Sequence, residues 1–298
     1  MRKILIAIIV FQISFIGKSQ LYDTSLVKLR TETINDNSKI DIIYLSKKNQ
    51  KIKTKFLAYK VNNQSVYERF KDFSKQNILI YYSTAAYSEY SFNVKTSRPA
   101  GLSIDNGKIV NGNLAKNQRT GKNEMDGIVI ISPDGSLNIS NLKESIFIKH
   151  GNEEKTSSCD FKNSYDFYRF KSFANENNIS VFQTHLLAWE GKLTFENNLS
   201  KVAARERRFL AIGIDENGNE IHCLVNYENL ETLFNSSKNI LEFLQNERNI
   251  KVTAMINMET GASDVAGFIL SNGVKSSEFS GKMESSESHN FLIYYFNK

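Results

Sequence analysis

Residues 211–225 read AIGIDENGNEIHCLV, and this stretch decides the class of fold. Two apolar runs of strand length, Ala211 to Asp215 and Glu220 to Val225, flank the polar segment Glu216-Asn217-Gly218-Asn219. Asparagine and glycine tolerate the positive φ angles that a tight turn needs, so the stretch predicts a β-hairpin.

Runs of the same kind occur along the rest of the chain. Further β-branched or aromatic runs of strand length are Asp41–Leu45, Asn77–Tyr82, Ile128–Ser132, Phe209–Asp215 and Asn290–Phe296. The turn sequences Asp105-Asn106-Gly107 and Pro133-Asp134-Gly135 predict two more hairpins.

Helices are fewer than strands. Ser65 and Glu68 have the spacing of a capping box and predict a helix start, with Val66, Phe70 and Phe73 on one face. A second helix is predicted after Ser164, with Tyr165, Tyr168 and Phe173 inward, and a third from Ser237 through Ile240, Leu241 and Leu244. The sequence therefore predicts a mixed α+β fold, with strand-rich sheets and a few covering helices.

The first 19 residues have the pattern of a cleaved signal peptide. Arg2 and Lys3 precede the apolar run from Ile4 to Ile16, and Gly17-Lys18-Ser19 offers small residues at the cut. The apolar run is shorter than the roughly 20 residues of a membrane-spanning helix. We therefore expect a secreted or periplasmic protein that keeps no stable membrane anchor after cleavage. We also expect residues 20–74 to pack as strands and a helix on a main domain over residues 75–298.

Composition excludes two other classes of protein. The formal net charge is +6, and acidic and basic residues are interspersed, so nucleic acid is not an expected partner. Hydrophobic residues make up 41% of the chain, which is enough to build a core and excludes a disordered protein.

Cysteines and histidines do not have the spacing of a metal site. Cys159 and Cys223 either pair as a disulfide or stay free thiols, and the sequence favours neither. The histidines are scattered, at positions 150, 185, 222 and 289, and no CxxC or HExxH spacing occurs. The nucleophile elbow and the glycine-rich phosphate loops are also absent, so no metal and no cofactor is expected.

An ordered series of segments between about residues 75 and 275 resembles the phosphodiester glycosidase family. The segments are 80–87 (IYYSTAAY), 99–108 (PAGLSIDNGK), 127–135 (GIVIISPDG), 182–187 (FQTHLL), 208–215 (RFLAIGID) and 257–264 (NMETGASD). The resemblance implies a fold of the phosphodiester glycosidase type and hydrolysis of sugar-1-phosphate diesters in glycan or polysaccharide metabolism.

Site residues follow from the same resemblance. Glu259 is the implied carboxylate at the reacting centre, and Asp264 is a possible second one. The implied substrate-binding residues are Ser83, Gln183, Arg208, Asn257, Gly261 and Ser263. The three segments Tyr82–Tyr87, Phe209–Gly213 and Asn257–Ser263 are expected to line one cleft.

The chain departs from the family pattern at several of these positions. Ser83 stands where the family has asparagine, and Phe209 stands where it has arginine. Near Glu259, two positions that are glycine in the family carry other residue types. Arg208 is one position early, which on a strand points a side chain to the opposite face. Three readings stay open: a phosphodiester glycosidase that hydrolyses sugar-1-phosphate diesters, a catalytically degenerate secreted module that binds a glycan or phosphoglycan, and an envelope protein with a protein partner. The departures from the family pattern lead us to expect weak or absent glycosidase activity.

The signal-peptide pattern makes a testable prediction about the mature protein. We expect its N-terminus at or near Gln20, because the small residues Gly17 and Ser19 occupy the two positions that a signal peptidase recognises. Mass spectrometry of the exported protein measures this directly, and intact Met1 in the exported fraction would contradict the prediction.

Overall fold

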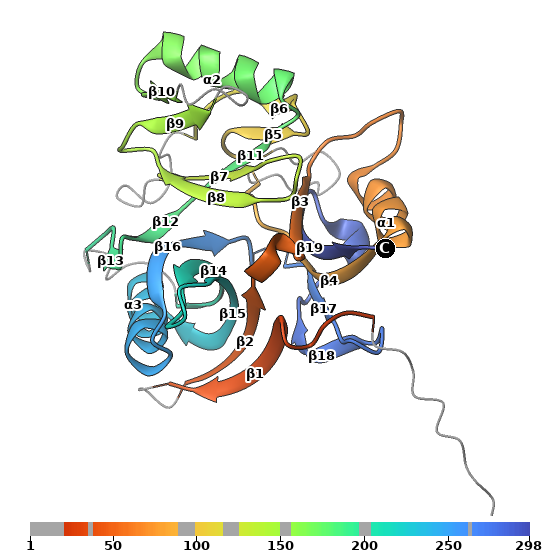
Figure 1. Ribbon diagram of the computed structural model, residues 1–298, viewed down its shortest axis with the longest axis vertical. Helices are drawn as coiled ribbons and strands as arrows, with labels where there is room; N and C mark the ends of the chain where they lie inside the picture. The colour runs from red at the N-terminus through yellow and green to blue at the C-terminus, as the bar shows by residue number, and fades with distance from the viewer. Residues whose placement is uncertain are drawn as a thin grey trace, which may run out of the picture.

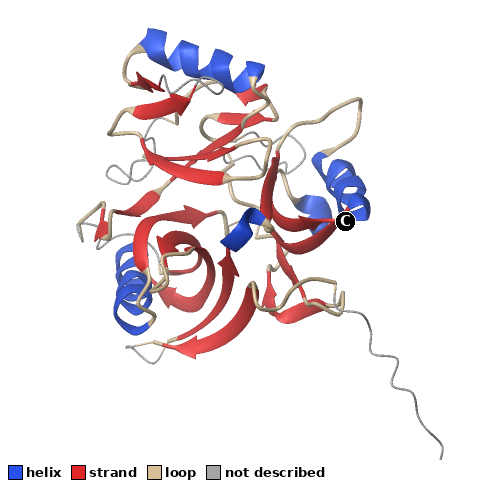
Figure 2. Ribbon diagram, viewed as in Figure 1, coloured by secondary structure: helices blue, strands red, loops and turns tan. Residues whose placement is uncertain are grey.

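Strands dominate the computed structural model, which describes residues 21–34, 38–88, 99–115, 125–149, 156–196, 204–261 and 264–298. The segment expected to be a signal peptide lies outside these ranges. Three α-helices accompany several antiparallel sheets within the described residues, which confirms the predicted α+β class (Figure 1, Figure 2). None of the helices in these ranges has the length and apolar character needed to cross a membrane.

The largest sheet has seven strands in the order β1-β2-β15-β14-β16-β12-β13. Their bounds are β1 (Val27–Thr33), β2 (Lys39–Ser46), β12 (Leu186–Trp189), β13 (Lys192–Leu193), β14 (Arg205–Ile214), β15 (Glu220–Glu231) and β16 (Lys251–Met258). Antiparallel pairing of β14 with β15 brings Ile214 opposite Glu220, and Gly218 has a φ of 79° in the turn. The predicted hairpin is therefore confirmed and lies at the centre of this sheet.

Two five-stranded sheets and one short strand pair complete the fold. One sheet runs β6 (Lys108–Asn111), β5 (Ser103–Asp105), β11 (Ser180–Thr184), β7 (Gly127–Ile131), β8 (Leu137–Asn141). The other runs β18 (Lys275–Ser280), β17 (Ala266–Ile269), β4 (Asn77–Ser83), β19 (Phe291–Asn297), β3 (Lys53–Leu57). The pair is β9 (Ile146–Lys149) with β10 (Thr156–Cys159). The predicted turns at Asn106-Gly107 and at Gly135 join β5 to β6 and β7 to β8.

The helices are α1 (Val66–Gln76), α2 (Ser164–Glu176) and α3 (Leu233–Glu242), and a π-helical turn, Phe243–Glu247, continues α3. The predicted capping box is confirmed, because the Glu68 amide donates to Ser65 Oγ at 3.2 Å and the Ser65 amide donates to the Glu68 carboxylate at 2.7 Å. The third helix begins four residues before the predicted Ser237, since Thr232 caps it through the amide of Asn235.

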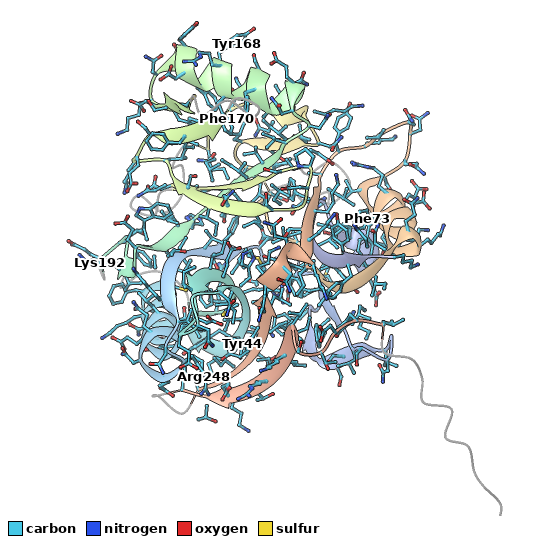
Figure 3. The ribbon with its side chains drawn as sticks, viewed as in Figure 1. Tyr44, Phe73, Tyr168, Phe170, Lys192 and Arg248 are labelled. Carbon is cyan, nitrogen blue, oxygen red and sulfur yellow. The ribbon has the colours of Figure 1, made fainter. Side chains whose placement is uncertain are left out.

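The inward face of α2 differs from the prediction. Tyr165 and Tyr168 are exposed at 67% and 65%, whereas Phe170 and Ala174 are buried. Figure 3 shows Tyr168 on the outer side of the helix and Phe170 on the side of the sheet. Phenylalanine has no hydroxyl to desolvate, so burying the phenylalanine face costs less than burying the tyrosine face.

One hydrophobic core is shared by the three large sheets. It receives Leu210 and Ile256 from the seven-stranded sheet, Phe56 and Leu292 from the sheet of β3, and Phe182 from the sheet of β11. The rings of Phe56 and Phe182 stack across two of the sheets, with 4.8 Å between their centroids. The sheets are thus held together by a common inner layer.

Each large sheet has its other face covered by one helix. Phe209 packs with Ile240 under α3, Val181 packs with Phe170 under α2, and Phe291 stacks on Phe70 of α1. Because the central strands are buried on both faces, their sequences are continuous apolar runs and not alternating ones.

The two cysteines are free thiols in separate cores. Cys159 lies in the core under α2, and Cys223 lies in the core under α3. Burial raises the pKa of both thiols, which keeps them in the unreactive thiol form.

A buried carboxylate connects α1 to the sheet of β5. Asp105 accepts hydrogen bonds from the amides of Ala58 and Tyr59 at 2.7 and 2.9 Å. Arg69 of α1 binds both of its carboxylate oxygens, at 2.6 and 3.2 Å. Asp105 therefore joins β5 to the residues that follow β3 and to α1.

We predict that Asp105→Ala lowers the free energy of unfolding by about 3 to 5 kcal/mol, because it leaves the Arg69 guanidinium without its carboxylate partner and the amides of Ala58 and Tyr59 without their acceptor. Urea denaturation measures the loss. Glu216→Ala, which removes an exposed carboxylate from a turn, serves as the control and should leave the midpoint nearly unchanged. Equal midpoints for the two variants would contradict the assigned role of Asp105.

Candidate functional site

A cleft of about 260 Å³ opens where β14 begins and β16 ends. Its lining residues are Tyr87, Ala204, Arg205, Glu206, Arg207, Leu230, Glu259, Thr260, Gly261 and Lys282. They come from five separate stretches of chain. Antiparallel pairing of β14 with β16, which sets Arg208 opposite Met258, brings two of these stretches together.

Glu259 follows the last residue of β16 and is only 9% exposed. Its amide donates to the carbonyl of Ala85 at 3.4 Å, which fixes its backbone against the segment after β4. One carboxylate oxygen accepts from the amide of Gly261 at 2.8 Å, and the other accepts from the amide of Ser88 at 3.4 Å. The carboxyl group is thus oriented by backbone amides on two sides.

The net effect of these surroundings is to raise the pKa of Glu259. Burial is the largest cause, and the negative charge of Asp264 acts in the same direction. The amides of Gly261 and Ser88 and the charge of Arg205 oppose the rise without cancelling it. Glu259 therefore keeps its proton to a higher pH than an ordinary glutamate, as general acids do.

Asn257 and Tyr87 form a hydrogen-bonded support next to Glu259. The Asn257 side-chain amide donates to the Tyr87 hydroxyl, which in turn contacts the Met258 carbonyl at 3.5 Å. The Thr184 hydroxyl donates to the Asn257 carbonyl at 2.5 Å, and the Tyr87 ring meets His185 edge-on at 5.1 Å. Asn257 Oδ1 is buried with no hydrogen-bond partner among the described residues, so this support retains one unused acceptor.

Three cationic side chains lie along the cleft. Arg205 and Arg207 stand at the start of β14, where a bulge shifts the register with β15, and Lys282 reaches in from the segment after β18. Lys282 forms an ion pair with Glu206 at 2.5 Å. With Glu206 and Glu259 as the acidic groups, the lining has one more positive group than negative groups. Such a lining favours an anionic ligand.

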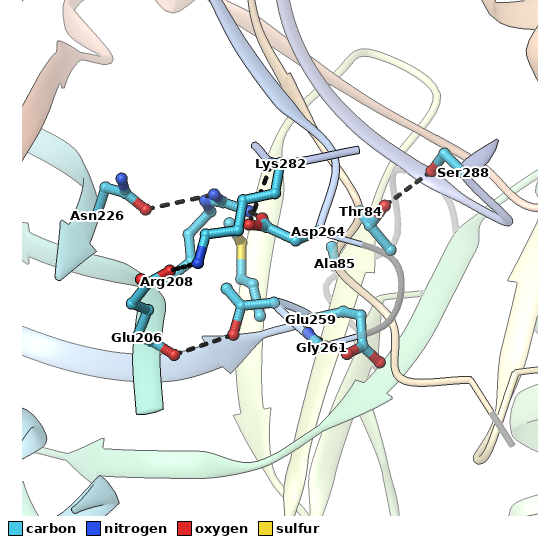
Figure 4. Close-up of polar contacts among 12 residues, drawn as sticks. Thr84, Ala85, Glu206, Arg208, Asn226, Glu259, Gly261, Asp264, Lys282 and Ser288 are labelled. Carbon is cyan, nitrogen blue, oxygen red and sulfur yellow. Dashed lines mark hydrogen bonds and ion pairs between the residues drawn. The ribbon is translucent and has the colours of Figure 1, made fainter. Parts of the chain in front are cut away.

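Arg208 and Asp264 form a buried ion pair beside this cleft and do not line it. Arg208 Nη1 lies 2.8 Å from Asp264 Oδ1, and its Nη2 donates to Asn226 Oδ1 at 3.3 Å (Figure 4). Their side chains are 1% and 7% exposed. Asp264 also accepts the Lys282 amide at 3.3 Å, so both oxygens of its carboxylate are engaged.

The two neighbouring positions on β14 point to opposite faces, as the strand period requires. Phe209 is buried in the core under α3, whereas Leu210 enters the core shared by the sheets. Arg208 lies on the side of Leu210, which is the side on which Asp264 meets it. No residue of the segment 209–213 lines the cleft. The part of β14 that lines it is the preceding stretch, Arg205 to Arg207.

Ser83 and Gln183 are not among the residues that line the cleft. Ser83 is fully buried in β4, opposite Ala266 on one side and Leu292 on the other. The Gln183 side-chain carbonyl accepts from the amides of Leu102 and Ala115, at 3.1 and 2.7 Å, and its amide donates to the Met125 carbonyl at 2.7 Å. Gln183 thereby holds the loops around β5 and β7.

Gly261 is at the cleft, and a Cβ there would lie 2.9 Å from a Glu259 carboxylate oxygen. Ser263 lies outside the described residues. Sequence reasoning did not identify Lys282, because nothing in its local sequence marks it. No group of three or more metal-ligating side chains occurs within the described residues.

Comparisons with known proteins give only weak similarities. No family model matches the chain, and no curated protein matches it. The catalytic domain of a zebrafish N-acetylglucosamine-1-phosphodiester alpha-N-acetylglucosaminidase, auto-inhibited by its pro-peptide, is similar with a TM-score of 0.46 and 14% identity over 91% of this chain and 82% of that one. A hypothetical protein from Synechocystis has a TM-score of 0.46 and 10% identity, over 92% and 62% of the two chains. A protein of Burkholderia pseudomallei named for its inferred export has a TM-score of 0.40 and 5% identity, over 86% and 74%. Similarities this low do not transfer a function.

The Arg208–Asp264 pair predicts an asymmetric response to mutation. Arg208→Met should lower the free energy of unfolding by about 3 to 5 kcal/mol, because it leaves the Asp264 carboxylate buried without its partner. The double variant Arg208→Met, Asp264→Leu should recover most of that loss, since both charges are removed together. Urea denaturation of the three proteins tests this.

The control for that series is the exposed ion pair of Lys75 and Asp72. Lys75→Met should leave the unfolding midpoint close to that of the unmodified chain, because water screens exposed pairs. A double variant that is as unstable as Arg208→Met alone would show that the pair is not an isolated electrostatic unit.

Proposed function

We propose that the cleft beside Glu259 binds the phosphodiester group of a phosphorylated saccharide, and that the protein does so outside the cytoplasm as a phosphodiester glycosidase-like protein. The observation that carries the proposal is the convergence of three cationic side chains on one buried carboxyl group whose pKa is raised. On this proposal the ligand's phosphate faces the cations and its sugar approaches Glu259.

Arginine geometry supports the phosphate part of the proposal. The planar guanidinium group presents paired N–H donors that match two phosphate oxygens, and it stays charged at all relevant pH values. Burial lowers the pKa of Arg207, but an arginine starts so high that it keeps its proton. Arg207 is 8% exposed, so its charge is poorly screened by water and acts strongly on a ligand in the cleft.

The saccharide part rests on the resemblance of two segments to the phosphodiester glycosidase family. Residues 80–87 and 257–264 carry that resemblance, and they meet at the cleft through the contacts of Tyr87 with Asn257 and of Ala85 with Glu259. Carboxyl, amide and hydroxyl groups in one polar wall are the groups that recognise sugar hydroxyls.

Hydrolysis is the second candidate, and the raised pKa of Glu259 favours it. A general acid needs such a pKa to protonate a leaving oxygen near neutral pH. Cleavage of a glycosidic bond normally also needs a second carboxyl group. Asp264 is engaged with Arg208, and Glu206 is paired with Lys282, so Glu259 has no free carboxyl partner among the described lining residues. We therefore expect binding to exceed catalysis.

We predict that the affinity of the cleft for a methyl phosphodiester of a sugar 1-phosphate depends on pH. This ligand keeps one negative charge at all working pH values, so only the protein's titration changes the affinity. As pH falls through the raised pKa of Glu259, the carboxylate gains a proton and stops repelling the ligand, and affinity should rise. Glu259→Gln should remove this dependence and bind tightly throughout. Calorimetric titration at several pH values measures both proteins.

Two further variants separate specific binding from a general charge effect. Arg207→Met should weaken binding at least about tenfold, as expected for the loss of a charge-assisted contact. Arg30→Met removes an exposed arginine on β1 and should leave affinity unchanged. Equal losses for the two variants would contradict the assigned site. Robust release of sugar that Glu259→Gln abolishes would establish the hydrolase and refute our preference for binding.

A further inference from the structure

A second pocket surrounds Trp189, the single tryptophan of the chain. It has a volume of about 320 Å³ and lies between the β12–β13 hairpin and the end of the sheet of β7 and β8. Its lining includes Asp126, Asn141, Lys143 and Lys192. No lining residue of this pocket lines the cleft of Glu259.

We infer that this pocket is a binding subsite for a neutral saccharide, with Trp189 as the surface on which a sugar ring packs. The inference is independent of the proposed function, because it rests on other residues. A volume near 320 Å³ is at the small end of ligand pockets, which run from about 300 to 1,000 Å³, and suits one or two sugar rings better than a long polymer segment.

The position of Trp189 suits the C–H face of a sugar. Its side chain is half-buried and packs against the core shared by the sheets, which fixes the ring. The same residue lines the pocket, so an apolar surface stands among polar groups. A pyranose has an apolar face of C–H groups and a rim of hydroxyls, and this combination of surfaces is complementary to it.

The charges of the pocket favour a neutral ligand. Asp126 and Lys143 pair at 2.9 Å, and Glu190 is opposed in sign by Lys192. The two acidic and two basic groups balance, so neither a phosphate nor a cation gains a net attraction. Hydroxyl groups both donate and accept, and they can bind the carboxylates, the ammonium groups and the Asn141 amide alike.

The hairpin that carries Trp189 is preformed. Glu190 and Gly191 have φ angles of 49° and 78°, the positive values of a two-residue turn that matches the strand twist. Trp189 pairs with Lys192 across the turn, and the Glu190 amide donates to the Thr253 carbonyl at 2.8 Å. Figure 3 shows Lys192 at the edge of the molecule, where this hairpin ends. A fixed ring binds with little loss of side-chain entropy.

Because the chain has one tryptophan, its fluorescence reports on this pocket alone. The purified chain is titrated with the methyl glycosides of glucose, galactose, mannose and N-acetylglucosamine, and separately with inorganic phosphate. We expect a saturable change in emission with at least one glycoside and none with phosphate. Glu259→Gln should give the same response, which keeps this test separate from that of the proposed function.

Asp126→Ala should weaken the affinity for the responding glycoside about tenfold, through the loss of one charge-assisted hydrogen bond. Asp126 pairs with Lys143, which is 53% exposed, and water screens such a pair, so this variant should keep its fold, and a thermal melt checks that it does. Glu216→Ala is the matched control and should bind normally. Unchanged emission and a flat calorimetric titration with every glycoside would overturn the inference. An equal response to phosphate, or full affinity in Asp126→Ala, would also overturn it.

Discussion

Side chains that alternate along β14 connect two cores, and the rest of the structure depends on that alternation. Leu210 and Ile212 enter the core shared by three sheets, while Phe209 and Ala211 enter the core under α3. The same division occurs in the other two large sheets, each with its own helix on the outer face. Burial on both faces gives a central strand about twice the apolar area of a strand with one wet face, which stabilises the strand and fixes its register.

The candidate site lies at the edge of these cores, where β14 begins and β16 ends. β16 stops at Met258, and the next residue, Glu259, is the first that leaves the sheet. On β14 the boundary between the cleft and the protein interior lies between Arg207, which lines the cleft, and Arg208, which is buried with Asp264. A buried ion pair at the border thus separates the apolar interior from the charged cleft. Its desolvation costs free energy, and the hydrogen bond from Arg208 to Asn226 offsets part of that cost.

Features with local causes could be predicted from the sequence. The hairpin at Gly218 and the capping box at Ser65 each depend on a few adjacent residues, and both are present. The prediction of which face of α2 points inward was wrong. Helical periodicity does not distinguish tyrosine from phenylalanine, although only tyrosine has a hydroxyl that must be desolvated on burial. The order of strands in the sheets and the cleft position of Lys282 depend on long-range packing, which no local pattern encodes.

The place of β19 in its sheet affects how the chain acquires its fold. This strand pairs with β4 on one side and with β3 on the other, although more than 200 residues separate it from either partner in sequence. Until Phe291 to Asn297 has been synthesised, β3 has no paired strand in this sheet, and β4 is paired on the β17 side alone. Contacts of such long sequence separation form slowly because the intervening chain must be ordered first. A nascent chain of this protein therefore stays incompletely folded, and open to chaperones, until β19 has been synthesised.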